Sequence, residues 1–384
     1  MKHFRIVVAA AILMSATHVW AQPTSRQKHL GISGPTTTAL GGPGASFIRC
    51  NSNPAAGEAV RKGFTPPIHP IIDATVRDTY ICVGHDGRYY LTGSTGDDVW
   101  RANDGIELWV SSDLKQWDYM GLVWSFDKDG TWQRAWRDHH GPARAIWAPE
   151  LHYIKGTYYL TISMPPGDRG LLRSTTGSPE GPYVNALADD GKWDEDIDAS
   201  LFQDDDGTVY VVWGGGWIAR MKDDMSGMAE APRKPVLLNP DTIASHHART
   251  CPPRRQCSDI GHEGAFLFKR NGLYYLTCAD TYEGRYSSMV AVSENIYGPY
   301  HGRHEAVPCG GGTGYFLDHN GRWWCGFFGN DSQAPFRSMP SIIRVDFSND
   351  GHIFPHQDQP MLNESEKVRW SVSWNKIWKD KYKK

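Results

Sequence analysis

One short unit recurs five times along the chain and restricts its fold more than any other feature. Each copy begins with a turn glycine and continues into an aromatic strand, as in "DGRYYLTGS" from Asp86 and "NGLYYLTCA" from Asn271. The other copies are "KGTYYLTIS", "DGTVYVVWG" and "NGRWWCGFF", which begin at Lys155, Asp206 and Asn320. A tight-turn residue followed by glycine and an alternating run is typical of a β-hairpin.

The spacing of the copies predicts the architecture. The second aromatic residues of the five units lie 69, 51, 65 and 49 residues apart; they are Tyr90, Tyr159, Tyr210, Tyr275 and Trp324. These intervals fit one four-stranded sheet per unit, with loops of varying length between sheets. Five such sheets predict an all-β fold, a five-bladed β-propeller.

The two ends of the chain differ from this repetitive middle. Residues 1–21 carry Lys2 and Arg5, then an apolar centre and a small-residue cleavage site at Ala21, which predicts a signal peptide. We therefore expect a secreted or periplasmic protein. Residues 22–64, rich in Gly, Pro, Ser and Thr, are predicted to be a flexible leader, and residues 65–384 one propeller domain. No later stretch approaches 18 uncharged apolar residues, so no membrane span is expected.

Charge and cysteine content exclude some classes of protein. A net charge of −3 offers no basic footprint, so we expect no nucleic-acid partner. The seven cysteines are odd in number; Cys251 and Cys257, which flank "CPPRRQC", are the pair expected to form a disulfide. Cys82, Cys278 and Cys325 lie in apolar strand patterns and are expected to be buried. No cysteines and histidines have zinc-site spacing, so no structural zinc is predicted.

A set of carboxylates shares one position in the repeat. The residues twelve positions before each second aromatic are Asp78, Trp147, Asp198, Glu263 and Gly312. Three of these five are acidic, although charged residues make up only 22% of the chain. The innermost strands of a propeller line its central channel, so equivalent positions should converge. Because buried like charges are costly without a purpose, this convergence predicts a functional site.

Each acidic residue also has an ordinary structural interpretation. Asp78 could pair with its neighbour Arg77, and Asp198 lies in an acidic stretch that could be solvated. Glu263, after His262, could cap a turn. Their common phase in the repeat favours a shared site over three unrelated roles.

At these residues the sequence resembles glycoside hydrolase family 43, inverting arabinofuranosidases, xylosidases and arabinanases built on five-bladed propellers. The segments that carry the resemblance are "RDTYICVGHDGRYYLTGS", "LWVSSDLKQW", "IWAPELHYIKGTYYLTIS", "IDASLFQDDDGTVYVVWGG" and "GHEGAFLFKRNGLYYLTCAD". They run in the family order from about residue 65 to 330. The resemblance implies a glycoside hydrolase that acts on plant or algal oligosaccharides or polysaccharide side chains.

The resemblance also implies roles for individual residues. The general base of the family falls on Asp78, the pKa-modulating aspartate on Asp198 and the general acid on Glu263. An inverting glycosidase needs an ionised base and a protonated acid, far enough apart to admit water. We expect a negative Asp198 to raise the pKa of Glu263 by repulsion, so that Glu263 keeps its proton. Trp147 is expected to form a wall for the sugar ring.

Several residues depart from the family pattern. Thr313 takes the place of a histidine that lies near a central cation or water in the family, and we expect Thr313 among the substrate-binding residues. No cofactor is expected to be required, and this departure leaves the presence of a central calcium open. Arg77 and His262 are neighbours of the acidic residues and are expected either to contact substrate or to pair with the adjacent carboxylate. His262 also resembles the histidine acid of family 117, propellers that release anhydrogalactose.

Three functions follow from these observations. The first is an exported inverting hydrolase of the α-L-arabinofuranosidase or β-xylosidase type, with Asp78 and Glu263 as catalytic groups. A family 117-like anhydrogalactosidase acting on agaro-oligosaccharides, with His262 as acid, is the near alternative. The third is a noncatalytic propeller that binds sugar, although a binding protein has little need of three converging carboxylates.

Overall fold

The computed structural model describes residues 70–96, 99–140, 145–165, 167–193, 196–238, 259–282, 285–307, 310–330 and 338–356. All of them lie in one of two compact units, residues 35–384. The signal peptide and the leader expected from the sequence lie outside the described residues. So do Cys251, Cys257 and the boundaries of the expected domain.

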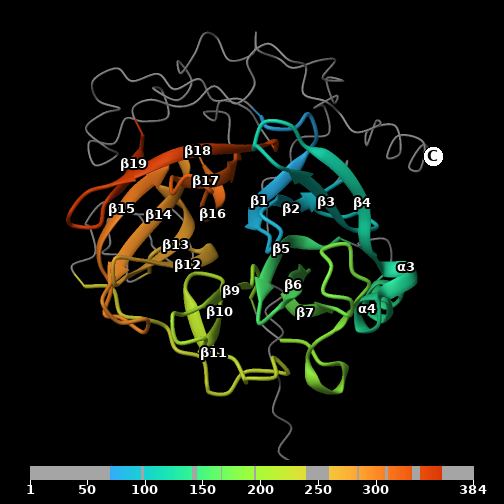
Figure 1. The fold of residues 1–384 in the computed structure, drawn as a ribbon. Coiled ribbons are helices and arrows are strands. Elements are labelled where there is room, and N and C mark those ends of the chain that lie inside the picture. The colour runs from blue at the N-terminus through green and yellow to red at the C-terminus, as the bar shows by residue number, and fades with distance from the viewer. Residues whose placement is uncertain are drawn as a thin grey trace, which may run out of the picture. The chain divides into compact units, whose positions relative to one another are not determined.

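The described residues form five antiparallel sheets of consecutive strands, arranged as the blades of a propeller (Figure 1). The first blade contains β1 (Val76–Val83), β2 (Tyr89–Thr95), β3 (Gly105–Ser111) and β4 (Asp118–Ser125). The second contains β5 (Trp147–Ile154), β6 (Thr157–Met164), β7 (Asp168–Ser174) and β8 (Tyr183–Asn185). The third contains β9 (Ser200–Gln203), β10 (Val209–Trp213) and β11 (Trp217–Arg220). The fourth contains β12 (Glu263–Arg270), β13 (Leu273–Tyr282), β14 (Arg285–Ser293) and β15 (His301–Val307). The fifth contains β16 (Gly311–Leu317), β17 (Trp323–Phe328), β18 (Pro340–Phe347) and β19 (Ile353–Pro355).

The first strands of the blades make a closed inner ring. β1 contacts β5, β5 contacts β9, β9 contacts β12, β12 contacts β16, and β16 returns to β1. Backbone hydrogen bonds reinforce this closure, because Ile71 and Val76 donate to the carbonyls of Pro340 and Ser338 in the last blade. The all-β propeller expected from the hairpin repeat is therefore confirmed.

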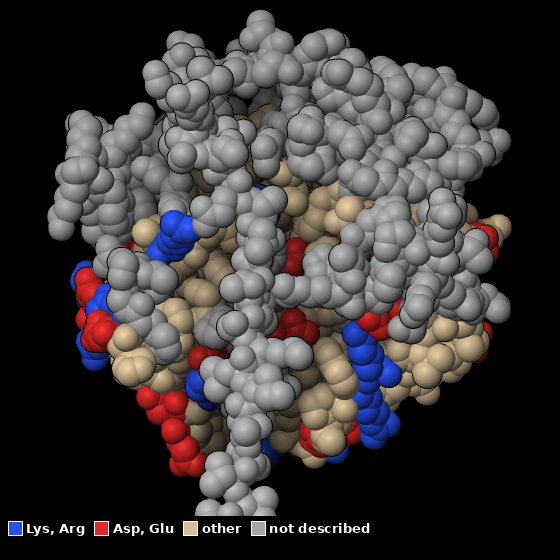
Figure 2. Space-filling view, turned by 180° about the vertical axis from the view of Figure 1, so that it is seen from behind, with Lys and Arg blue, Asp and Glu red and all other residues tan. Residues whose placement is uncertain are grey.

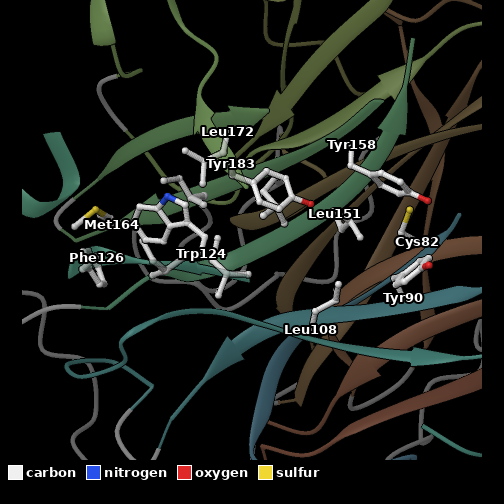
Figure 3. Close-up of a cluster of buried hydrophobic side chains, with 14 residues drawn as sticks. Cys82, Tyr90, Leu108, Trp124, Phe126, Leu151, Tyr158, Met164, Leu172 and Tyr183 are labelled. Atoms are coloured by element: carbon white, nitrogen blue, oxygen red, sulfur yellow. The ribbon is translucent and has the colours of Figure 1, made fainter. Parts of the chain in front are cut away.

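Apolar and aromatic side chains fill the space between neighbouring blades. Trp124 and Leu108 of the first blade pack with Leu151 and Tyr183 of the second, and each is at most 2% exposed (Figure 3). Burying side chains of this size contributes about 1.5–3 kcal/mol each. The repeat aromatics belong to this packing, since Tyr90, for example, is fully buried. Tyr159, Tyr275 and Trp324 are likewise at most 5% exposed, so these repeat aromatics stabilise the core.

Short helices occupy two of the described connections between strands. α3 (Phe126–Asp129) begins after Ser125, whose hydroxyl accepts a hydrogen bond from the Lys128 amide. α4 (Trp132–His140) follows it, so the segment before β5 is partly helical, and η2 (Ala188–Asp190) is a single 3₁₀ turn. Within the described part of the chain, no helix has the length and apolar character needed to cross a membrane.

Cys82, Cys278 and Cys325 are buried free thiols, as predicted from their apolar strands. Burial raises the pKa of Cys82 to about 12, so this thiol stays protonated and packs as a small apolar group.

Acidic and basic side chains are interspersed over the described part of the rear face, and acidic atoms also lie in the middle of that view (Figure 2).

Candidate active site

A bulge at the start of four of the five inner strands shapes the site. In β1 three steps from Arg77 to Tyr80 oppose two steps from Ser94 to Thr92 on β2, so the inner strand carries one extra residue. β5, β12 and β16 have the same irregularity. The extra residue has a left-handed backbone in every case; these residues are Asp78, Ala148, Gly264 and Gly312, and Asp198 takes this conformation just before β9. Bulges bend a strand and redirect its side chains, which is common next to active sites.

The bulges show that residues twelve positions before the second aromatic of each repeat are not all structurally equivalent. Arg77, Trp147 and Glu263 are equivalent, because each precedes the left-handed residue of its own blade. Asp78 is thus one residue further along the repeat than Trp147 and Glu263. The reason is that Val83 pairs with Tyr89 six residues later, whereas the equivalent Tyr153 and Lys269 pair with residues five positions later. The hairpin is one residue shorter in these two blades.

Three of the left-handed residues are held by the preceding blade. The amide of Ala148 donates to Ser94 Oγ at 2.7 Å, and the amide of Asp198 donates to Ser163 Oγ at 2.7 Å. The amide of Gly264 in turn donates to Asp198 Oδ2 at 3.2 Å. This series of hydrogen bonds fixes the inner strands of four blades relative to one another.

Asp78 is held from two sides. The Ser94 hydroxyl donates to Asp78 Oδ2 at 2.6 Å. Gly312 lies so close that a Cβ there would be 2.7 Å from Asp78 Cα, which explains why this repeat position is glycine in the last blade. Burial raises the pKa of Asp78, and the charge of Arg77 and the Ser94 hydrogen bond only partly offset it.

Asp198 carries the strongest penalty for ionisation in this group. Burial, then the negative charges of Glu263 and Asp78, raise the pKa of Asp198 well above its ordinary value. The three carboxyl groups lie in one region: Asp198 Oδ2 accepts from the amide of Gly264, next to Glu263, and the charge of Glu263 raises the pKa values of both Asp78 and Asp198.

Glu263 has a different environment from the one expected. The Tyr286 hydroxyl donates to Glu263 Oε1 at 2.5 Å, and His262 Nε2 lies 3.4 Å from the same oxygen. Burial by itself opposes a charge on Glu263. The hydrogen bond and charge of His262, followed by the hydrogen bond from Tyr286, outweigh burial and lower the pKa of Glu263 to about 2.

The expectation that Asp198 keeps Glu263 protonated is therefore wrong for this arrangement. His262 and Tyr286 stabilise the carboxylate more than repulsion destabilises it. The proton lies instead on His262: burial disfavours the imidazolium, but the hydrogen bonds and charges of Asp280 and Glu263 raise the pKa of His262 to about 10. Of the two roles expected for His262, pairing with the adjacent carboxylate is the one that the geometry shows.

Arg77 is buried between aromatic rings. Its guanidinium carbon lies 4.6 Å from the centre of the Trp100 ring and 4.2 Å from that of Phe328. Arg77 Nη2 donates to Asn330 Oδ1 at 2.6 Å. The positive charge of Arg77 lowers the pKa values of Asp78 and Glu263, so this residue compensates the acidic group electrostatically.

An aromatic pair borders the acidic group. Trp147 Nε1 donates to the carbonyl of Trp100 at 3.3 Å, and the two rings meet edge to face with centres 6.1 Å apart. Trp100 is 39% exposed, so part of this pair faces solvent. An aromatic face beside polar groups suits a sugar ring, which supports the wall expected of Trp147.

Sequence reasoning missed several residues of this region. Ser94, Ser163 and Tyr286 lie on second or third strands, and Trp100 lies in a loop, so none of them has the phase of the acidic residues. Glu150 was also missed; it is 17% exposed, lies 3.0 Å from His152 Nε2, and raises the pKa of Asp198. Its carboxylate lies on the inner strand β5, three residues after Trp147, and a carboxylate on an inner strand was the sign in the sequence that could have identified it.

The described residues do not favour a metal centre. Calcium prefers six to eight oxygen ligands, several of them carboxylates. Among the residues that the structure describes, no group of three or more His, Cys, Asp or Glu side chains is arranged to hold a metal ion. The side chain of Thr313 is not among those described, so its expected place among the substrate-binding residues stays a prediction.

Comparison with known proteins agrees with this geometry. A family model described as glycosyl hydrolases family 43 matches residues 68–353. Xylosidase/arabinosidase 43A of Humicola insolens is 28% identical over 228 residues, which are 47% of this chain and 65% of the relative. An extracellular exo-α-(1→5)-L-arabinofuranosidase of Cellvibrio japonicus is 24% identical over 246 residues, 57% of this chain and 67% of the relative. The chain spans only 45% and 41% of two further relatives, from Xylanibacter ruminicola and Escherichia coli.

Solved structures share the fold. A thermostable family-43 glycoside hydrolase superposes with a TM-score of 0.56 at 20% identity, covering 77% of this chain and 97% of that one. The endo-arabinase from Bacteroides thetaiotaomicron has the same TM-score and identity, with 74% and 98% covered. Since the family model extends over most of the chain and the propeller geometry agrees, the chain belongs to glycosyl hydrolases family 43 and its propeller is a glycoside hydrolase domain.

Proposed function

We propose that this domain hydrolyses O-glycosidic bonds with inversion, on α-L-arabinofuranosides or β-xylosides in plant or algal oligosaccharides and polysaccharide side chains. One observation carries the proposal. Asp78, Asp198 and Glu263 come from three different blades, influence one another electrostatically, and lie in the same region as an aromatic pair that is partly exposed. The xylosidase and arabinofuranosidase relatives support the choice of sugars.

In the proposed reaction, Asp78 accepts a proton from water as the water attacks the anomeric carbon. The C–O bond to the leaving group breaks, its electron pair stays on the leaving oxygen, and that oxygen takes up a proton through Glu263, whose neighbour His262 carries it at neutral pH. Asp198 holds the amide after Glu263 and so orients the acid. Attack opposite to the leaving group inverts the anomeric configuration. Acid–base chemistry of this kind uses no cofactor.

The proposal extends to the location and the partner of the protein. We place the mature chain outside the cytoplasm because residues 1–21 have the pattern of a signal peptide. Its partner is then an oligosaccharide or polysaccharide rather than a nucleic acid, in keeping with the net charge of −3.

A second candidate has support from one contact. His262 lies beside Glu263 and carries a proton at neutral pH, because its pKa is raised to about 10. A family 117-like hydrolysis of agaro-oligosaccharides would use His262 itself as the acid. The two candidates differ in which side chain is indispensable.

The test is hydrolysis of a panel of substrates by the wild type and variants. The panel contains nitrophenyl arabinofuranoside, xyloside and galactoside, arabinan and agaro-oligosaccharides, with product anomers followed by NMR. We expect an inverted pentose from the wild type and about 10²- to 10⁴-fold lower kcat for Glu263→Gln on unactivated substrates. Asp78→Asn should lose activity on every substrate, because an activated leaving group removes the need for an acid but not for the base that takes the proton from water.

Other results would redirect the assignment. Cleavage of agaro-oligosaccharides by Glu263→Gln, but not by His262→Gln, would select the second candidate. Retention of configuration would refute the roles of both carboxylates. Sugar binding without cleavage of any substrate would make the propeller a binding module.

A further inference from the structure

A line of four alternating charges runs through the fourth blade to the proposed acid. Arg303 on β15 donates from Nη2 to Asp280 Oδ2 at 2.8 Å, and Asp280 Oδ1 lies 3.1 Å from His262 Nδ1. The other ring nitrogen of His262, Nε2, lies 3.4 Å from Glu263 Oε1. The side chains of Arg303, Asp280, His262 and Glu263 are 1%, 2%, 8% and 15% exposed. Burial therefore decreases steadily toward the acid.

The geometry around the imidazole favours two protons on the ring. Both nitrogens face carboxylate oxygens, which only accept hydrogen bonds when ionised. A neutral imidazole has one N–H and one lone pair, so a lone pair would face one of the two carboxylates. The doubly protonated ring satisfies both Asp280 and Glu263.

Charge balance leads to the same protonation state. With His262 protonated, the two positive and two negative groups cancel. With His262 neutral, one negative charge would remain uncompensated among buried side chains, which is costly. Arg303 also donates from Nε to the carbonyl of Ile260 at 2.8 Å, so the Arg303 end of the line is anchored to the backbone.

Other charged and titratable groups also face this pair. Tyr286 of β14 contacts Glu263 and packs edge to face against the His262 ring. Charges on the first and third blades also interact with Glu263; they belong to Arg77, Asp78, Asp196 and Asp198, and Lys234 lies near Asp196. These charges contribute to the pKa of Glu263 in addition to its neighbour His262.

We propose that the His262–Glu263 pair, rather than Glu263 alone, is the proton donor of the reaction, and that Asp280, anchored by Arg303, is the positioning residue that keeps the proton on this pair. This inference rests on the proposed function. In the step, the proton leaves His262 Nε2 for Glu263 Oε1 and passes from there to the leaving oxygen, which keeps the electron pair of the broken C–O bond. Asp78 gains the proton of the attacking water. The pair is reset when that proton returns through solvent.

The first test needs no substrate. The protein is labelled with ¹⁵N-histidine, and the His262 signals are assigned by their loss in His262→Gln. In the wild type we expect both ring nitrogens to remain protonated up to at least pH 8. In Asp280→Asn the titration should move down by about 1–3 pH units, the usual effect of losing an opposite charge at this distance.

The second test uses kinetics. For a glycoside with a poor leaving group, the basic limb of kcat/KM against pH should move down by the same interval in Asp280→Asn. For an activated dinitrophenyl glycoside, which needs no proton donor, the limb should not move. A merely structural defect would lower both rates in parallel.

The controls separate positioning from folding. Asp318→Asn removes another buried carboxylate that pairs with an arginine, Arg322, but lies outside the line; this variant should leave the His262 titration unchanged. If Asp280→Asn does not fold, the double variant Asp280→Asn with Arg303→Gln removes both charges and leaves no unpaired buried ion.

The outcomes discriminate between the two proposals. Titration of His262 near the ordinary histidine value in the wild type would overturn the inference, as would an unchanged titration and pH profile in Asp280→Asn. Failure of the wild type to cleave any glycoside would refute the proposed function instead, while the NMR titration would still decide whether the line holds the proton.

Discussion

Ser94 offers a direct measure of how the fold sets the protonation of the proposed base. Its hydroxyl donates to Asp78 Oδ2 at 2.6 Å and accepts from the amide of Ala148 at 2.7 Å. Ser94→Ala removes both hydrogen bonds with little change in volume. Because the donated bond stabilises the carboxylate, its loss should raise the pKa of Asp78 further.

The size of the effect follows from the kind of hydrogen bond. A hydrogen bond to a charged group contributes about 1.5–3 kcal/mol, and about 1.4 kcal/mol corresponds to one pKa unit. A base works only when ionised, so the acid limb of kcat/KM should move up by about 1–2 pH units. Leaving the buried Ala148 amide without its partner should cost a further ~1–3 kcal/mol of unfolding free energy.

The assay is kcat/KM from pH 4 to 9 together with urea unfolding. Ser163→Ala is the matched control, because Ser163 has the same position in the next blade and accepts from the amide of Asp198. This control should lose similar stability but leave the acid limb in place. An acid limb that moves equally in both variants, or in neither, would refute the assignment of the limb to Asp78.

Three further predictions concern the acidic group, the aromatic pair and metal dependence. Asp198→Asn should raise the unfolding free energy at pH 7 by about 0.5–2 kcal/mol while lowering activity. Because the folded-state pKa of Asp198 is raised, its ionisation costs stability as pH rises through that pKa, and the stability gain of the variant should vanish at low pH. Equal gains at pH 4 and pH 7 would contradict this reasoning. Trp100→Ala should raise KM about 2- to 12-fold with a small change in kcat, as expected for a lost aromatic contact, whereas an unchanged KM would exclude Trp100 from sugar binding. Dialysis against EDTA should leave kcat/KM within about twofold, since the proposed steps use only side-chain acids and bases; activity that is lost and then restored by Ca²⁺ would show a required metal.

The fold could be predicted from the sequence because its information is local. A turn residue, a glycine and an alternating aromatic run specify a hairpin within about ten residues, and five repeats of that hairpin specify five blades. The same periodicity located Asp78, Asp198 and Glu263, which converge because inner strands of a propeller face one axis. The helix before β5 was missed, although Trp132, Ala135 and Trp136 recur at the spacing of an amphipathic helix.

The exact register within the repeat was harder to predict. The interval of twelve residues located the acidic residues, yet Asp78 is one bulge position later than Glu263. A one-residue difference in hairpin length between blades produces this shift, and only the observed strand pairing reveals it.

The sequence by itself therefore determined the blades, their inner strands and the residue types at the ends of those strands. Only the tertiary structure decided which groups share protons. Asp280 and Arg303 lie on the second and fourth strands of their blade, and their distance from Glu263 along the chain says nothing about contact. Protonation depends on the sum of charges from neighbouring strands and blades at distances of a few ångströms. Packing sets these distances. Here they lower the pKa of Glu263 and raise that of His262, so that His262 carries the proton that the sequence had assigned to Glu263.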